Sequence, residues 1–289
     1  MKHKIFTGLA ATLFVLILGF GLKAVFAGQL ILPQAFNLGP LSIRFYGLCL
    51  ALAASAAYFL AVRRSKQYGL DSSATESVVL FLLVGGFVGA RLYHVVSEIG
   101  YYIQNPLLIP AVWRGGLSIF GAILGGIAAL ALYTRYSEAG KKISLLSLLD
   151  WIVPSVVLGQ IIGRFGNLFN YEAYGNPTSV SWKMFVPPQF RLAPFEKVEY
   201  FHPLFLYEAI ASGIILIILL RLSPKLDPGK LFFLWLLLYN AVRFFLEIIR
   251  LDSVMVSGIR LNMIVAGILA LIGLAGYRNL YALKNTPDR

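Results

Sequence analysis

The sequence predicts an all-α integral membrane protein, a bundle of about eight transmembrane helices with a small extracytoplasmic cap. Three observations support this fold class. Apolar residues make up 58% of the 289 residues, and the mean hydropathy is +0.77. Charged residues account for only 13%. Several apolar stretches approach or exceed the roughly 18–20 residues that a helix needs to cross a bilayer.

The expected helices are separated by short polar connections. They lie at about residues 5–26, 43–62, 76–97, 116–134, 144–163, 204–220, 231–250 and 258–277. With the N-terminus placed inside, every inner segment is basic, whereas the outer connections 28–42, 99–115 and 251–257 contain one clear loop cation, Arg114. Because cytoplasmic loops carry an excess of Lys and Arg, both termini are expected in the cytoplasm. Residues 278–289 would then form a cytoplasmic tail.

The first segment has two interpretations. Residues 1–29 form either an additional N-terminal transmembrane helix or a signal peptide, since two lysines precede an apolar run. The run from Ile5 to Leu22 is long for the apolar part of a signal peptide, which favours a retained helix. The topology of the remaining spans is the same in both cases.

The segment at about 176–203 departs from the pattern of spans. It contains five prolines together with mixed charges and aromatic residues. This composition suits a small external cap better than another helix that crosses the membrane.

Charge and cysteine content narrow the possible partners. The net charge of +12 is explained by basic inner loops and a few buried arginines, so nucleic acid is not expected as a partner. The single cysteine, Cys49, excludes an intrachain disulfide. The three histidines are scattered and lack the spacing of metal ligands, so neither a metal nor another cofactor is expected.

Ionisable and polar side chains in and beside the spans gather toward one side of the membrane. Such residues are costly in a bilayer, usually face the interior of a bundle, and are functional candidates. With the topology above, they all lie near the outer leaflet: Arg44, Tyr46, Arg91, His94, Glu98, Arg164, Asn167, Asn170, Glu172, His202, Tyr207, Glu208, Tyr239, Arg243, Glu247 and Arg250. A transporter needs polar groups through its full depth. The one-sided distribution favours an enzyme that acts on lipid or on a translocated substrate.

The helix expected at 231–250 carries a polar stripe. At about 100° per residue, Tyr239, Arg243, Glu247 and Arg250 fall within a stripe roughly 80° wide. The plain structural interpretation is an Arg243–Glu247 pair that neutralises itself inside the bundle. Further arginines nearby leave positive charge in excess, which favours an anion, and the planar fork of arginine matches phosphate oxygens.

The segment from Gly159 to Gly175 is the most informative one. Gly166 allows the backbone to bend or to approach a ligand, and the expected helix ends before it, at about residue 163. Arg164, Asn167 and Asn170 would supply hydrogen-bond donors around this bend. The structural alternative is a capped helix end that leads into a loop.

The sequence resembles the prolipoprotein diacylglyceryl transferase family in several blocks that follow the family's order. The most specific is Gly163-Arg164-Phe-Gly-Asn167-Leu-Phe-Asn170-Tyr-Glu172-Ala-Tyr-Gly175. The others are Ile43-Arg-Phe-Tyr46-Gly47, Gly89-Ala-Arg91, Trp113-Arg-Gly-Gly-Leu-Ser, His202-Pro203 with Leu206-Tyr207-Glu208, and Tyr239-Asn-Ala-Val-Arg243-Phe-Phe-Leu-Glu247. The resemblance covers about residues 30–277. It implies a seven-span core that includes the cap, with the N-terminal helix as an addition.

The resemblance implies an activity. Such an enzyme transfers the sn-1,2-diacylglyceryl group of phosphatidylglycerol to the lipobox cysteine thiol of a preprolipoprotein, forming a thioether and releasing glycerol 1-phosphate. It implies a multi-pass protein of the bacterial cytoplasmic (inner) membrane with its active site toward the outer leaflet, and a monomer is expected.

The resemblance also implies roles for individual residues. Arg164 and Arg243 would clamp the phosphate, and Glu247 would orient Arg243. The remaining expected substrate-binding residues are Tyr46, Arg91, Asn167, Asn170, Glu172, His202 and Tyr239.

This chain departs from the family pattern at three positions. Phe120 stands where the family commonly has a histidine, a candidate base for the thiol, while Tyr171 and Ala90 each replace a glycine. The thiol proton has two possible routes: another base, namely Glu247, His202 or His94 with Glu98, or no dedicated base, if the arginines lower the thiol pKa. The alternative function is a catalytically inactive membrane protein that binds phosphatidylglycerol or translocates lipid.

Overall fold

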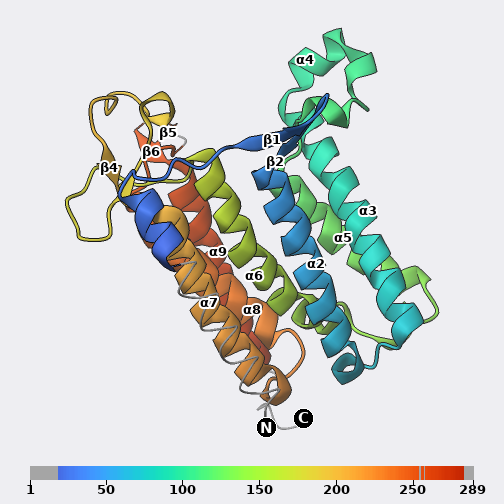
Figure 1. Cartoon of the computed structure of the whole chain (residues 1–289). Coiled ribbons are helices and arrows are strands. Elements are labelled where there is room, and N and C mark those ends of the chain that lie inside the picture. Colours follow the sequence, from blue (N-terminus) through green and yellow to red (C-terminus); the bar gives the residue numbers. More distant parts are fainter. Residues whose placement is uncertain (1–18, 254, 257, 283–289) are drawn as a thin grey trace, which may run out of the picture. The chain divides into compact units, whose positions relative to one another are not determined.

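The computed structural model describes residues 19–253, 255–256 and 258–282 (Figure 1). Within this part, seven helices are long and apolar enough to cross a membrane. They are α2 (Phe45–Ser65), α3 (Ser72–Ser97), α5 (Ile119–Tyr136), α6 (Leu145–Asn170), α7 (Leu204–Leu222), α8 (Lys230–Ile248) and α9 (Leu261–Ala282). These helices confirm the predicted all-α membrane fold, whereas the external cap at about 176–203 stays a prediction. Residues 19–26 are helical, but most of the expected first span lies outside the described residues, so the additional N-terminal helix stays a prediction.

Short elements that the sequence did not predict connect the spans. Three two-stranded antiparallel hairpins pair β1 (Ala35–Leu38) with β2 (Leu41–Arg44), β3 (Met184–Phe185) with β4 (Tyr200–Phe201), and β5 (Met255–Val256) with β6 (Ile259–Arg260). The remaining helix is α4 (Ile99–Gln104), and 3-10 turns lie at Lys66–Tyr68, Pro106–Leu108, Val112–Arg114, Gly140–Lys142, Pro188–Phe190 and Ser223–Lys225. Strands of two to four residues are too short to show a periodic hydrophobic pattern.

The chain divides into two compact units. The described part of the first covers residues 19–55, 157–218 and 235–275, and that of the second covers residues 56–156, 219–234 and 276–282. The core of the first unit is largely aromatic, with Tyr171, Tyr174, Phe201 and Phe205 buried beside Met184.

In the second unit, α3 and α5 run side by side (Figure 1). The Asp71 side chain caps the start of α3 by accepting a hydrogen bond from the Ala74 backbone N–H (2.7 Å). Glycines face each other where the two helices meet. A Cβ atom on Gly125 would lie 2.2 Å from the Gly85 carbonyl oxygen and 2.8 Å from the Gly89 Cα atom. The contact therefore requires residues without side chains.

Replacement of Gly125 by valine is expected to lower the melting temperature of the detergent-solubilised protein. The added atoms have no space between the two backbones, and overpacking of this kind costs about 1–3 kcal/mol or more. Differential scanning fluorimetry measures the change. Gly213→Ala, in α7, is the matched control because no atom lies within 4 Å of its added Cβ. Equal melting temperatures for Gly125→Val and the parent protein would contradict the close packing.

In the first unit, α6 is longer than predicted. The helix expected to end at about residue 163 continues to Asn170, so the predicted bend at Gly166 is wrong. Gly166 serves close packing instead, because a Cβ atom there would lie 2.8 Å from the Cδ2 atom of Tyr46. Arg164 and Asn167 consequently project from a regular helix, about one turn apart.

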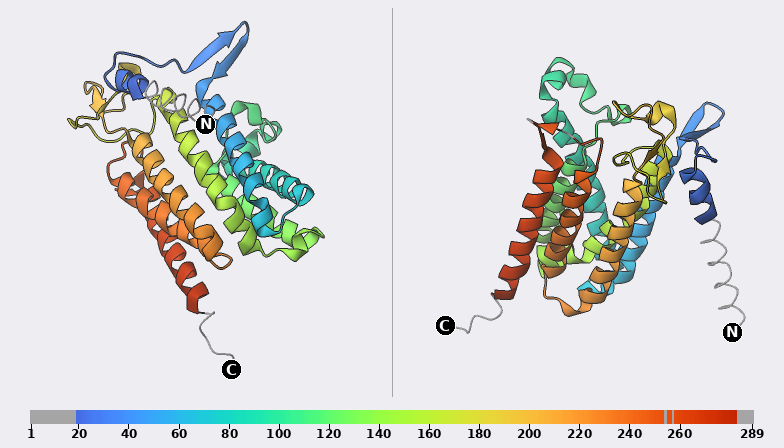
Figure 2. Two further views of the ribbon diagram at one scale, coloured as in Figure 1. Left: turned by 60° about the horizontal axis from the view of Figure 1, so that its bottom comes forward. Right: turned by 90° about the vertical axis from the view of Figure 1, so that its left-hand side faces the viewer.

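The C-terminal pair of spans is joined by the β5–β6 hairpin. Both views of Figure 2 show α8 and α9 side by side. Within the first unit they pack closely, since a Cβ atom on Gly267 would lie 3.6 Å from the Phe244 ring. The expected span 231–250 ends at Ile248, which places Arg250 just beyond the helix.

Candidate active site

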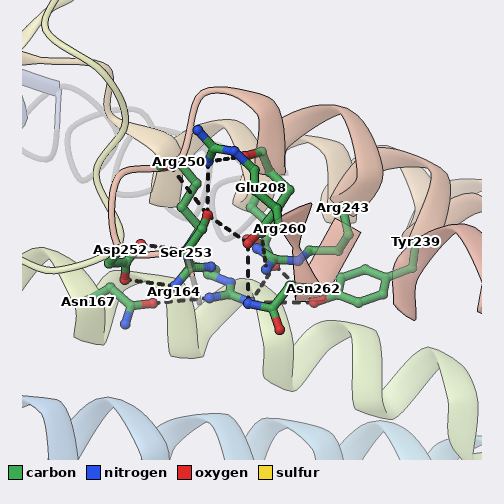
Figure 3. Close-up of polar contacts among 11 residues, drawn as sticks. Arg164, Asn167, Glu208, Tyr239, Arg243, Arg250, Asp252, Ser253, Arg260 and Asn262 are labelled. Carbon is green, nitrogen blue, oxygen red and sulfur yellow. Dashed lines mark hydrogen bonds and ion pairs between the residues drawn. The ribbon is translucent and has the colours of Figure 1, made fainter. Parts of the chain in front are cut away.

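Glu208 lies between two arginines of other helices (Figure 3). It belongs to the second turn of α7, and its side chain is only 2% exposed. Its Oε1 atom accepts hydrogen bonds from Arg164 Nη2 and from the Tyr239 hydroxyl (2.9 Å). Its Oε2 atom accepts one from Arg243 Nη1 (2.9 Å). A single carboxylate therefore connects α6, α7 and α8.

Glu247 supports the other edge of Arg243. The predicted i,i+4 pair is confirmed, with Arg243 Nη2 2.9 Å from Glu247 Oε2. The second oxygen, Oε1, accepts hydrogen bonds from Ser253 Oγ (2.8 Å) and Asn262 Nδ2 (3.2 Å). Glu247 is fully buried, and a buried carboxylate is tolerated only when its oxygens are satisfied in this way.

The arginines are more accessible than the carboxylates that hold them. Arg164 and Arg243 are 22% and 14% exposed, whereas Glu208 and Glu247 are 2% and 1% exposed. A guanidinium has five N–H donors, and only part of each set is occupied by the described residues. The carboxylates thus compensate the arginine charges from the buried side and leave N–H groups for another anion.

The end of α8 is held by an arginine that the sequence analysis did not consider. Arg260 Nη1 donates hydrogen bonds to the backbone carbonyls of Glu247 (2.7 Å) and Arg250, and to Ser253 Oγ (3.0 Å). These carbonyls lie at the C-terminus of the helix, where intrahelical donors are lacking. The β5–β6 hairpin carries Arg260 back to this point, which accounts for the end of α8 at Ile248.

Arg250 and Asp252 form a two-point ion pair next to the helix end. Arg250 Nε lies 2.5 Å from Asp252 Oδ1, and Nη2 lies 2.9 Å from Oδ2. Although burial opposes the charge, the hydrogen bonds and the negative charge of Asp252 raise the pKa of Arg250 above its ordinary value. Arg250 therefore stays charged.

Figure 3 draws four arginines and three carboxylates of the network, and a fourth carboxylate, Glu172, is bonded to it through Asn167, so the formal charges balance. The arginines are Arg164, Arg243, Arg250 and Arg260, and the carboxylates are Glu208, Glu247 and Asp252.

The amides that follow Arg164 along α6 converge on a further carboxylate. Asn167 Nδ2 and Asn170 Nδ2 donate to Glu172 Oε1 over 2.8 and 3.2 Å. Asn167 Oδ1, the side-chain amide oxygen, in turn accepts a long hydrogen bond from Arg164 Nη1 (3.4 Å). The structure therefore brings four residues of the predicted site together at the end of one helix.

A strained turn directs Glu172 back toward α6. Tyr171 and Ala173 both adopt the left-handed backbone conformation, with φ of 52° and 54°, which glycine adopts most easily. This conformation accounts for the glycine of the resembled family at the position of Tyr171. Here the Tyr171 ring stacks on Phe190 (5.0 Å between centroids), and its hydroxyl accepts a hydrogen bond from the Leu32 N–H (2.6 Å). Burial raises the pKa of Tyr171, which keeps the hydroxyl neutral.

The two predicted tyrosines lie at different points of this unit. The Tyr239 hydroxyl donates to Glu208, and its ring stacks on Trp235 (6.0 Å between centroids). Tyr46, at the start of α2, has its ring against Gly166 of α6. Both positions agree with residues that line a site, although a contact with substrate stays a prediction.

Arg91 belongs to the second unit and is occupied by backbone carbonyls. Nε and Nη2 donate to the carbonyl oxygens of Ile109 and Leu108 (both 2.6 Å), and Nη1 donates to those of Gly115 (2.9 Å) and Gly116 (3.0 Å). These bonds organise the connection between α4 and α5. The role of Arg91 in substrate binding stays a prediction.

His202 lies in the first unit at the start of α7. Its Nδ1 atom is 3.0 Å from the Tyr207 hydroxyl, which also accepts a hydrogen bond from Trp182 Nε1 (2.7 Å). Its carbonyl accepts from the Gly175 N–H (2.9 Å), and Gly175 pairs with Arg250 in an isolated β-bridge. His202 is thus connected to the network through backbone, and its substrate contact stays a prediction.

Five residues of the network were not predicted from the sequence. Glu208 was counted among the outer ionisable residues without a role, and Arg260, Asn262, Asp252 and Ser253 were not selected. A signal existed for two of them, because Glu208 and Arg260 stand within expected apolar spans, where an ionisable residue is costly.

Comparisons with known proteins agree on one family. Residues 33–278 match the model of the family described as prolipoprotein diacylglyceryl transferase. A protein of Synechococcus elongatus is 38% identical over 264 residues, which cover 89% of this chain and 90% of the relative. A relative from Fervidobacterium nodosum is 37% identical, with 93% and 92% covered, and one from Staphylococcus haemolyticus is 37% identical, with 84% and 86% covered. All three are named phosphatidylglycerol–prolipoprotein diacylglyceryl transferase.

Proposed function

The chain belongs to the prolipoprotein diacylglyceryl transferase family, and from this premise we propose that Arg164 and Arg243 hold the phosphate of the lipid donor. The protein is a multi-pass membrane enzyme that transfers a diacylglyceryl group from phosphatidylglycerol to a prolipoprotein. The observation that carries the proposal is the Glu208 bridge, which holds two partly exposed guanidinium groups against one buried carboxylate.

The leaving phosphate is the group that most needs stabilisation during the reaction. A cysteine thiolate of the prolipoprotein attacks the phosphate-bearing carbon of the diacylglyceryl group. A carbon–sulfur bond forms there, and the bond between this carbon and the phosphate oxygen breaks. The electron pair of that bond leaves with glycerol 1-phosphate, so negative charge grows on the phosphate oxygens. Cations that are already in position stabilise this charge most effectively, because they need no reorganisation during the reaction.

The surrounding side chains supply this preorganisation. Glu208 and Glu247 each contact Arg243, which defines the plane of its guanidinium from two sides. Tyr239 adds a hydrogen bond that restrains Glu208. Asn167, Asn170 and Glu172 follow next to Arg164 and would contact the head group, while Tyr46 would line the cavity.

The thiol proton needs an acceptor other than residue 120, which is phenylalanine. Glu247 is poorly suited, because it is fully buried and both of its oxygens accept hydrogen bonds. Two routes remain. Either His202, or His94 with Glu98, takes the proton, or the arginines stabilise the thiolate and no dedicated base is needed. A bound phosphate adds negative charge beside the arginines, which weakens the last route.

We further propose that the enzyme lies in the bacterial cytoplasmic membrane, with the network near the outer leaflet. The basic inner segments support this orientation. The network uses residues of one chain, so a monomer suffices for the chemistry.

Reconstitution tests the proposed reaction. The purified full chain is incorporated into phosphatidylglycerol vesicles with a short lipobox peptide, and peptide mass and glycerol phosphate release are followed together. The expected result is a diacylglyceryl mass gain that matches the released glycerol phosphate and disappears with a Cys→Ser peptide. Lipid binding without release, in a preparation where a histidine-containing relative is active, would indicate the catalytically inactive alternative. Restoration of turnover by Phe120→His would then locate the cause.

A further inference from the structure

A cavity of about 220 Å³ lies next to the arginine network, within the first unit. Its lining comes from three separate segments: the end of α6 with the strained turn, the cap segment around residues 190–192, and the residue that pairs with Arg250. The lining residues are Asn170, Tyr171, Glu172, Ala173, Tyr174, Phe190, Leu192 and Asp252. No role follows for this cavity from the phosphate clamp alone.

The aromatic walls are held in place by their own hydrogen bonds. The Tyr174 hydroxyl donates to the Phe190 carbonyl (2.7 Å) and accepts from the Leu192 N–H (2.9 Å). Tyr171 stacks on Phe190. Because the hydroxyls of both tyrosines are occupied in the wall, the cavity is preformed, and its aromatic faces offer apolar contact.

The polar groups of the cavity are mainly acceptors. Glu172 uses one oxygen, Oε1, to accept from the two asparagines, and Asp252 is paired with Arg250. Carboxylates accept several hydrogen bonds each and donate none. A complementary ligand therefore brings at least two hydrogen-bond donors. A phosphate is repelled by both carboxylates and belongs on the arginines instead.

The cavity is connected to the phosphate clamp by shared side chains. Arg164 contacts Asn167, which contacts Glu172 on the cavity wall. On the other side, Asp252 of the wall is bonded to Arg250 of the network. One side chain, Asn167, thus separates Arg164 from the cavity wall.

Resting on the proposed phosphate clamp, we propose that this cavity binds the glycerol head group of the donor lipid, with Glu172 and Asp252 accepting its two hydroxyl hydrogens. Head-group selection then depends on Asp252 as well as on Glu172. The aromatic walls contact the carbon chain of the glycerol.

The size of the cavity limits its occupants. The cavity is smaller than the roughly 300–1,000 Å³ of pockets for drug-sized ligands, so it suits a group of a few heavy atoms and not an acyl chain. A polyol satisfies both acceptors without a charge.

The proposal is tested with two soluble probes of equal charge. The dissociation constants of sn-glycerol 1-phosphate and methyl phosphate are measured by calorimetry on the detergent-solubilised full chain. Both probes are phosphate monoesters, and only the first carries the polyol. The wild-type protein is expected to bind glycerol 1-phosphate at least about tenfold more tightly than methyl phosphate, because one hydrogen bond to a charged group is enough to produce a difference of this size.

Two variants test the carboxylate acceptors and the volume of the cavity independently. Asp252→Asn keeps the shape but weakens the acceptor, and Leu192→Trp fills the cavity while leaving both carboxylates in place. Each is expected to reduce the preference for glycerol 1-phosphate about tenfold, with methyl phosphate affinity little changed. Glu199→Gln, an exposed carboxylate of the cap outside the cavity, is the matched control and should keep the preference.

The outcomes distinguish the two proposals. An unchanged preference in both variants would overturn the head-group assignment while leaving the phosphate clamp intact. Failure of both probes to bind the wild-type protein would contradict the clamp itself. If Leu192→Trp keeps the preference but raises the KM for the lipobox peptide, the cavity serves the acceptor peptide and the assignment is wrong.

Discussion

Replacement of Arg243 by alanine is expected to reduce kcat for diacylglyceryl transfer by roughly a thousandfold, the upper range for loss of one preorganised donor to a developing anion. The side chain contacts both buried carboxylates, so its removal also leaves Glu208 and Glu247 with fewer donors. Initial rates of peptide modification in phosphatidylglycerol vesicles measure the effect. The loss should lie in kcat more than in KM, because the charge grows during bond cleavage.

Two variants control this result. Arg243→Lys keeps the charge but loses the planar fork, and an intermediate loss of about a hundredfold is expected. Arg221→Ala removes an exposed arginine from the last turn of α7 and should leave the rate unchanged. Full activity of Arg243→Ala would exclude the phosphate clamp.

Glu208→Gln is expected to impair both stability and activity. The substitution keeps the shape but removes the charge that compensates Arg164 and Arg243, and loss of one partner of a buried ion pair costs about 3–5 kcal/mol. With the bridge weakened, the two guanidinium groups lose their common orientation. A fall in kcat of about a hundredfold is expected at a temperature where the variant stays folded.

Kinetic measurements distinguish a role of Glu208 in positioning the arginines from a role in folding alone. If Glu208 orients the arginines, Glu208→Asp should recover part of the activity and the KM for phosphatidylglycerol should rise in Glu208→Gln. Glu76→Gln, an exposed carboxylate on α3, serves as the control. A variant with a lowered melting temperature but unchanged kcat and KM would assign Glu208 a purely structural role.

The membrane helices were predictable because their signal is local. An apolar run of sufficient length predicts a span without knowledge of its neighbours. The boundaries depended on contacts that the sequence does not display. In α6, which extends to Asn170, Gly166 packs closely against Tyr46, and α8 ends where Arg260 returns to its carbonyls.

The candidate site was predictable where its partners are close in sequence. The Arg243–Glu247 pair follows from i,i+4 spacing on one helix, and the structure confirms it. The Glu208 bridge joins residues 35 and 44 positions apart, so nothing local to Glu208 indicated its two partners. The left-handed turn at Tyr171 was hidden for another reason, since a tyrosine rarely adopts this backbone without tertiary support.

The arginine–phosphate contact is tested most directly by dipolar-coupling solid-state NMR. The full chain, with arginine side chains labelled with nitrogen-15, is reconstituted with phosphatidylglycerol and no peptide, so that the lipid is bound but not consumed. The proposal predicts nitrogen–phosphorus coupling that corresponds to a separation of about 4 Å or less, as expected for guanidinium N–H groups bonded to phosphate oxygens. The coupling should weaken in Arg243→Lys and in Arg164→Lys. Bound lipid without any such coupling in the wild-type protein would contradict the phosphate clamp.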